Sequence, residues 1–277
     1  MSYKEQLSEH VEKIFKSYNK PGLYICDLAT GGGKTHAIGK LSCGYYAKEY
    51  DRIVILCVQT RLVEDMEKAI KRYLADSDVI DASQILKVEK NIDVVKNALK
   101  ETSKKNLLSL LSEMKFEAGR CSDPNWQKKV SRSYEFVQNC FNTLRGYLKT
   151  AETDKTANLD FQIDDAERSL RQAMRVYFAN FKNYIEKSGK VKQATTKKIL
   201  STFPSLSSVY PQVEYSSKKI LLMTVHKALL GIDPILTEKI SLTDFTKGKG
   251  RTLIIFDESD QGAMAMRDTI IGQSIGD

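Results

Sequence analysis

The sequence has few cysteines, and their placement excludes two common kinds of scaffold. The five cysteines are an odd number and none forms a CxxC pair, so we expect neither a disulfide framework nor a zinc site. Cys26 and Cys57 lie inside apolar runs, where a free thiol behaves as a small hydrophobic group. This usage is typical of a protein kept in a reducing compartment.

Long hydrophobic runs are also lacking. No apolar segment approaches the roughly 20 residues that span a bilayer. The N-terminal stretch MSYKEQLSEHVEKIF is charged and amphipathic and has no apolar signal-peptide core. We therefore expect a cytoplasmic protein with no membrane partner. With 277 residues, 42% of them hydrophobic, the chain can bury a sizeable core in one large domain or two smaller ones.

Helical and strand-like patterns alternate over the first 80 residues and return near the end. Apolar positions at helical spacing predict three helices, over residues 3–17, 34–48 and 61–74. Short continuous apolar runs of the kind found in buried parallel strands predict four strands, at residues 23–28, 52–58, 219–225 and 252–258. This alternation predicts an α/β domain, with helices covering a parallel sheet.

The middle of the chain has a different pattern, because strand signals nearly vanish from about residue 85 to 200. Apolar side chains instead form two stripes at helical spacing, which indicate packed helices: Val137, Cys140, Phe141, Leu144 and Leu148, then Leu170, Met174, Tyr177, Phe178, Phe181 and Ile185. We therefore predict an α/β domain formed by residues 1–84 and 217–277, interrupted by a helical insertion at 85–216.

The stretch LATGGGKTHA, residues 28–37, has the context of a phosphate-binding loop. A predicted strand runs into Gly31, Gly32 and Gly33, and Lys34 and Thr35 then open a helix. Glycines let backbone N–H groups point at a phosphate, the lysine contacts the outer phosphates, and the hydroxyl serves Mg²⁺. The strict pattern requires a glycine where this chain has Leu28, so a glycine turn followed by chance by Lys-Thr is the alternative.

An acidic pair supports the nucleotide interpretation. Asp257 and Glu258 end the apolar run TLIIF, where one carboxylate can hold the water shell of Mg²⁺ and the next can orient the attacking water. An acidic turn after a strand is common by itself, but its occurrence together with a Gly-Lys-Thr loop is not. We therefore predict a site for ATP and Mg²⁺, in which Lys34, Asp257 and Glu258 carry the catalytic roles.

These motifs resemble those of superfamily 2 helicases and translocases. Their first motif commonly lacks the early glycine, and this chain matches it over Thr30-Gly31-Gly32-Gly33-Lys34-Thr35; their DExD motif corresponds to Asp257-Glu258-Ser259-Asp260. The resemblance covers about residues 1–80 and 217–260. It implies a RecA-like P-loop domain, nucleotide contacts from Thr30 to Thr35, and metal contacts from Thr35 and Asp257.

Three weaker matches follow from the same resemblance. Thr60-Arg61 corresponds to a motif that touches the nucleic-acid backbone, and Thr224 lies in the region of another; a helix cap and an ordinary loop are the alternatives. Gln6 resembles the glutamine that contacts adenine in many members, although an exposed helix glutamine would give the same pattern.

The resemblance stops before a second motor domain. No Ser-Ala-Thr motif follows the acidic pair before Asp277, and there is no length for a second RecA-like domain, which normally supplies arginine fingers. We therefore expect the first motor domain of a longer protein, with a missing C-terminal second motor domain as its partner. In isolation it should hydrolyse ATP slowly or not at all.

Positive charge points to nucleic acid as the other partner, with DNA favoured over RNA. The net charge is +8, and the stretch KNYIEKSGKVKQATTKK (182–198) carries six lysines and one glutamate. A solvated helix end would have the same composition. Trp126 beside Lys128-Lys129 could stack on the bases of a nucleic-acid strand, although a lone tryptophan more often packs in a core.

The leading hypothesis is thus the nucleotide-binding motor domain of an ATP-dependent helicase or translocase. One alternative is a packaging or signalling ATPase of the P-loop class, which uses the same two motifs. Another is a nucleotide-binding scaffold that recruits a partner through its helical insertion. The Thr-Gly-Gly-Gly-Lys-Thr form and Thr60-Arg61 favour the first, and the intact Lys34, Thr35, Asp257 and Glu258 argue against the scaffold.

Overall fold

The polypeptide forms two compact units. A computed structural model describes residues 3–17, 20, 22, 24, 33–99, 106–154, 158–189, 193, 195–245, 247 and 250–257. The first unit, which we call the α/β unit, comprises Met1–Val88, Tyr215–Ile232 and Ile240–Asp277. The second, which we call the helical unit, comprises Glu89–Glu214 and Asp233–Lys239.

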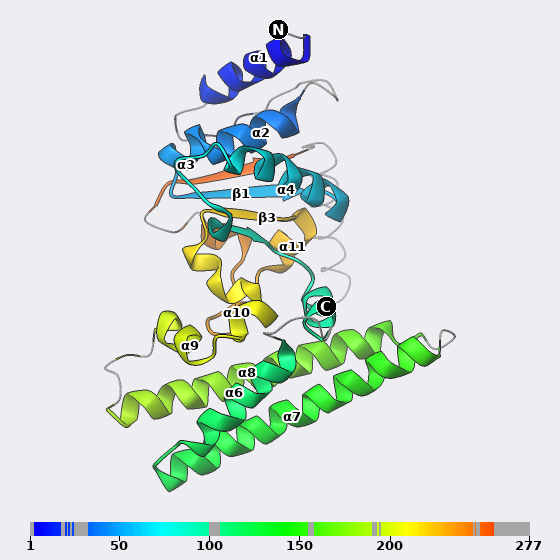
Figure 1. Cartoon of the computed structure of the whole chain (residues 1–277), viewed down its shortest axis with the longest axis vertical. Helices are drawn as coiled ribbons and strands as arrows, with labels where there is room; N and C mark the ends of the chain where they lie inside the picture. Colours follow the sequence, from blue (N-terminus) through cyan, green and yellow to red (C-terminus); the bar gives the residue numbers. More distant parts are fainter. Residues whose placement is uncertain are drawn as a thin grey trace. The chain divides into compact units, whose positions relative to one another are not determined.

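A four-stranded, wholly parallel sheet is the centre of the α/β unit (Figure 1). Its strands lie in the order β2-β3-β1-β4, with the bounds β1 Arg52–Cys57, β2 Ile85–Lys87, β3 Ile220–Thr224 and β4 Thr252–Phe256. In the register, Cys57 pairs with Thr224 and Leu56 with Phe256, so β1, β3 and β4 end at the same edge. The predicted RecA-like α/β class is confirmed.

Both faces of the sheet are covered, which explains the continuous apolar runs of its strands. Ile53 and Ile55 of β1 point into one core with Ile220 and Leu222, and Val54 and Leu56 point into a second core on the opposite face. All five residues from Ile53 to Cys57 are fully buried. A polar residue at any of these positions would have to be buried too.

Helices and 3₁₀ turns complete the α/β unit: α1 Tyr3–Ser17, α2 Lys34–Cys43, α3 Tyr45–Glu49, α4 Thr60–Leu74, η1 Ala82–Gln84, α11 Val225–Leu230 and η3 Leu242–Phe245. The first core joins α1, α2, α3 and α4 to the sheet. The helices α2 and α4 approach closely at Gly39, where an added Cβ would lie 3.0 Å from the backbone carbon of Ala69. A larger residue at this crossing would require its neighbours to give by a few tenths of an ångström.

Three expectations differ from the structure or lie outside the part it describes. The helix expected over residues 34–48 is broken at Gly44, whose φ of −124° and ψ of −92° separate α2 from α3. Residues 85–87, expected within the insertion, form β2, which pairs with β3. The sequence does not predict this strand, because three residues are too few to give a period-two pattern. The strand expected at 23–28 falls, except for Tyr24, outside the described residues.

The helical unit is built on a long antiparallel pair, α7 and α8, which lie side by side (Figure 1). Its elements are α5 Asn91–Ala98, α6 Leu107–Gly119, α7 Pro124–Thr153, α8 Asp160–Lys187, α9 Thr196–Thr202 and α10 Leu206–Val209, with η2 Pro211–Ser217 crossing the boundary. Both predicted apolar stripes contribute to its core. No described helix combines the length and apolarity that a membrane crossing requires.

A short segment, Asp233–Lys239, joins the helical unit through charges that are buried or partly buried. Arg171 of α8 contacts Glu167 at 2.7 Å and Asp233 at 2.5 Å, and Arg175 also pairs with Asp233. Burial lowers the pKa of Arg171, but the two carboxylates outweigh this and raise it, so the guanidinium stays charged. The Asp233 carboxylate also accepts the N–H of Ile235, whose φ is +61°.

Candidate nucleotide site at the sheet edge

The N-terminus of α2 has the backbone geometry of an anion site. Gly33 caps the helix with φ 79° and ψ 11°, a left-handed conformation that side-chain-bearing residues rarely adopt. Its carbonyl accepts the Ala37 N–H at 2.9 Å, and Lys34 and Thr35 form the first turn. No acidic residue lies in that turn, so the positive end of the helix dipole remains available to an anion.

Asp257, the first residue of the acidic motif, meets this turn. Asp257 follows β4 directly, and its N–H continues the sheet by donating to the Leu56 carbonyl at 2.9 Å. The residue is only 6% exposed, and its Oδ2 lies 3.5 Å from the Thr35 Oγ1. Two motifs separated by 222 positions in the sequence thus place a hydroxyl and a buried carboxylate against each other.

The pair has the oxygen chemistry of Mg²⁺ ligands. Mg²⁺ binds oxygen at about 2.0–2.1 Å in octahedral geometry, so two ligand oxygens lie roughly 2.9 Å apart when adjacent and roughly 4.1 Å apart when opposite. The 3.5 Å between Thr35 Oγ1 and Asp257 Oδ2 matches neither value, so the two oxygens would have to move about 0.6 Å closer to bind one ion as adjacent ligands. Mg²⁺ is commonly held by one or two carboxylates together with substrate phosphates. The chemistry of Thr35 and Asp257 therefore suits a nucleotide-bound magnesium ion.

The expected nucleic-acid residues lie at the same edge of the sheet. Thr60 and Arg61 are exposed in the first turn of α4, three and four residues after β1 ends. Gln59, not Thr60, occupies the cap position of that helix. Thr224 ends β3 and caps α11, where its hydroxyl accepts the Lys227 N–H at 3.1 Å. The capping role explains why a threonine stands there whether or not it contacts nucleic acid.

Two contacts that sequence reasoning missed hold the helices around α2. His36, next to Thr35, hydrogen-bonds through Nδ1 to the Tyr73 hydroxyl at 3.0 Å and so links α2 to α4. Lys40 donates to the largely buried Glu12 at 2.7 Å and links α2 to α1; this bond raises the pKa of Lys40. The sequence contains a signal for the second contact, because Glu12 interrupts the apolar side of a predicted helix and so needs a partner.

Several predicted site residues lie outside what the structure describes. Thr30, Gly31, Gly32 and Glu258 fall outside the described residues. Gln6 lies in α1, which packs on α2, but its side chain is not among those described. The described part of the predicted site is therefore Gly33, Lys34, Thr35 and Asp257, and the role of every site residue stays a prediction.

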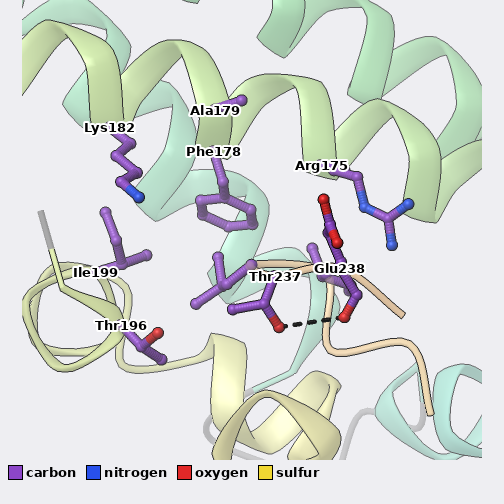
Figure 2. A pocket seen from close by; sticks show the side chains of 10 residues that line it. Arg175, Phe178, Ala179, Lys182, Thr196, Ile199, Thr237 and Glu238 are labelled. Carbon is purple, nitrogen blue, oxygen red and sulfur yellow. Dashed lines mark hydrogen bonds between the residues drawn. The ribbon is translucent and has the colours of Figure 1, made fainter. Parts of the chain in front are cut away.

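The helical unit has a pocket of about 350 Å³ between α8, α9 and the segment Asp233–Lys239 (Figure 2). Phe178 and Ile199 form part of its apolar lining, and Arg175 and Lys182 extend from α8 at either side of Phe178. Arg175 is already paired with Asp233. Thr237 and Glu238 of the segment Asp233–Lys239 also line the pocket.

The fold and the Thr35–Asp257 pair define a RecA-like nucleotide-binding domain. A family model described as the Type III restriction enzyme, res subunit, matches residues 1–139, half of the chain, and the chain belongs to this family. The family consists of N-terminal motor domains of DExD/H-type superfamily 2 helicases, which confirms the resemblance drawn from the motifs. Comparison with curated proteins finds no match. The matched residues end before Asp257, so the match does not extend to the acidic motif.

Proposed function

We propose that this chain is the ATP-binding first motor domain of a nucleic-acid helicase or translocase. Its family implies an ATP-dependent, helicase-like motor domain. The observation that supports the specific site most directly is the 3.5 Å approach of Thr35 Oγ1 to the buried Asp257 carboxylate. A chance Gly-Lys-Thr sequence would have no reason to face the acidic end of a strand more than 200 positions away.

Each residue of the proposed site has a distinct task. The backbone N–H groups of Gly31–Gly33 and the α2 N-terminus bind phosphate oxygens, and Lys34 neutralises the outer phosphates. Thr35 and Asp257 hold the magnesium ion, Glu258 orients water, and Gln6 contacts the base. ATP supplies the phosphoanhydride bond whose hydrolysis drives the motor. Because several donors converge on one anion, loss of Lys34 should weaken binding without unfolding the domain.

Nucleic acid is the proposed track of this motor, DNA in preference to RNA. Arg61 is exposed at the sheet edge and can pair with a phosphate. Thr60 follows β1 by three residues, and Thr224 ends the neighbouring strand β3. A second motor domain is the proposed partner that completes the nucleotide site with arginine, a contribution worth about 10³–10⁵ in rate in related phosphoryl chemistry.

A fluorescent-nucleotide titration tests the site. Lys34→Ala should weaken binding of ATP and ADP by about tenfold or more, since a hydrogen bond to a charged group contributes roughly 1.5–3 kcal/mol. Lys48→Ala is the matched control, because Lys48 lies exposed in the same unit and makes only a surface ion pair with Asp78. Equal affinities for wild type and Lys34→Ala would overturn the phosphate-loop assignment.

A further inference from the structure

The open end of the α7/α8 hairpin, where α7 begins and α8 ends, brings together an aromatic ring and two lysines. Trp126 lies in the first turn of α7 and is partly exposed, while one side of it packs on the helical core. The ammonium of Lys129 lies 4.8 Å from the ring centroid, and that of Lys187, the last residue of α8, lies 5.3 Å away. The aromatic–lysine cluster is therefore built from both helices.

Charge is distributed unequally between the two ends of this hairpin. The nine residues of each helix at the open end, 124–132 and 179–187, carry five basic side chains and one acidic: Lys128, Lys129, Arg132, Lys182, Lys187 and Glu186. The nine residues of each helix at the connected end, 145–153 and 160–168, carry three basic and five acidic side chains. A solvated pair of helices does not require this segregation, whereas a polyanion would bind only the open end.

A second pocket lies where α8 ends, between α6, α8 and α9. It has a volume of about 400 Å³, and its lining includes Arg120, Lys198, Ser201 and Thr202 above the buried ring of Tyr184. Arg120 also stacks on the exposed Phe116 at 5.2 Å and pairs with Glu117 at 3.2 Å. Cationic and hydroxyl donors beside aromatic rings thus continue from the cluster across the neighbouring helices.

We propose that the open end of the hairpin is a contact surface for single-stranded nucleic acid, with residues separate from those of the sheet edge. A single strand offers both phosphates for the lysines and unpaired bases for Trp126. An exposed lysine–ring contact is weaker than the stacking of a base on tryptophan, so a base can displace the ammonium, which then pairs with a phosphate. An acidic peptide would use the lysines but leave the ring unused. The inference rests on the proposed function, in which nucleic acid is the track.

Trp126 is the only tryptophan in the chain, so the proposed contact has its own reporter. Titration of the full chain with a 20-residue oligothymidylate at about 50 mM salt should quench its fluorescence, and added salt should reverse the effect. The variant Lys128→Gln/Lys129→Gln/Lys187→Gln should bind about tenfold more weakly. The slope of its log affinity against log salt concentration should become shallower by about 2, since each of the three lost phosphate contacts on a single strand contributes about 0.7.

The connected end provides a control with the same change of charge. Arg145→Gln/Lys149→Gln/Arg168→Gln removes three exposed cations from the same two helices and should leave both affinity and slope unchanged. Equal effects of the two triple variants would overturn the inference, because a general loss of positive charge would then explain both. Trp126→Leu should weaken binding about fivefold, measured by anisotropy of a labelled strand, and Trp126→Phe should largely restore it.

The outcomes separate this inference from the proposed function. Arg61→Gln should weaken binding measured by anisotropy but leave the extent of Trp126 quenching at saturation unchanged. Binding by anisotropy without any quenching, unaffected by the open-end variants, would overturn the inference and leave the motor proposal standing. An absence of binding to any nucleic acid, with nucleotide binding intact, would overturn both the inference and the proposed track while the nucleotide site survives.

Discussion

Buried and partly buried carboxylates have different neighbours in the two units of this protein. In the helical unit, Glu167 and Asp233 face the guanidinium of Arg171, which stays charged between them. In the α/β unit, Asp257 faces the hydroxyl of Thr35 at the end of a parallel strand. A carboxylate bound to arginine is committed to holding the fold, whereas one beside a hydroxyl and a helix N-terminus suits a metal–phosphate ligand.

The two units also differ in what stabilises them. The α/β unit buries both faces of a sheet under helices, and close approach of backbones, as at Gly39, is part of its packing. The helical unit has a core of long helices with aromatic rings, and a buried ion network attaches Asp233–Lys239 to it. Because each unit has its own core, we expect separate unfolding transitions, with Trp126 reporting the helical one.

Removal of the Asp233 carboxylate should have the largest effect on stability. Asp233→Ala leaves two arginines without their shared partner, and the loss should lie near the lower end of the range of about 3–5 kcal/mol for a buried ion pair, because these side chains are only partly buried. Urea unfolding followed by Trp126 fluorescence should show this loss. Asp233→Asn should lose less, since it keeps an oxygen for the Ile235 N–H. A matching shift in the unfolding transition of the α/β unit would contradict the independence of the units.

A methyl group at Gly39 should destabilise the other unit. In Gly39→Ala the new Cβ would lie 3.0 Å from the Ala69 carbonyl carbon and 3.1 Å from its Cβ, so α4 has to give by a few tenths of an ångström. Overpacking of this kind costs about 1–3 kcal/mol. Circular dichroism should show an earlier transition for the α/β unit, and nucleotide affinity should fall because α2 carries Lys34. The Trp126 transition should not move.

Gly146→Ala is the matched change in the helical unit and should have the smallest effect, with the opposite sign. Gly146 is exposed in the interior of α7, and an added Cβ meets no atom within 4 Å. Alanine should therefore stabilise α7 by about 0.5–1 kcal/mol. Equal destabilisation by both glycine substitutions would show that the crossing at Ala69 has no special role.

The main elements of the α/β unit could be predicted from the sequence because their patterns are long and consistent. The apolar run RIVILC became β1, and the helical spacing from Leu62 to Tyr73 became α4, each within a residue or so of the expected bounds. The three residues of β2 contain no period to detect, and the break at Gly44 depends on backbone angles that the pattern does not encode.

The candidate site could be predicted as a set of motifs but not as a geometry. Glycine, lysine, threonine and aspartate each occur in a recognisable motif beside a predicted strand. The ends of parallel strands then predict that these motifs share one edge of the sheet. The Arg171–Asp233 and Trp126–Lys187 contacts could not be predicted, because each joins residues about 60 positions apart through packing of α8. Such contacts are set by tertiary structure, which leaves no periodic signal in the chain.

The claim that Thr35 and Asp257 form one magnesium–nucleotide site is tested most directly by a double-mutant cycle. Nucleotide affinity is measured with Mg²⁺ and with EDTA for wild type, Thr35→Ala, Asp257→Asn and the double variant. If both side chains hold one ion, each single change should remove most of the gain from Mg²⁺, and the double change should remove little more. Additive losses, or a full gain from Mg²⁺ in Asp257→Asn, would contradict the account.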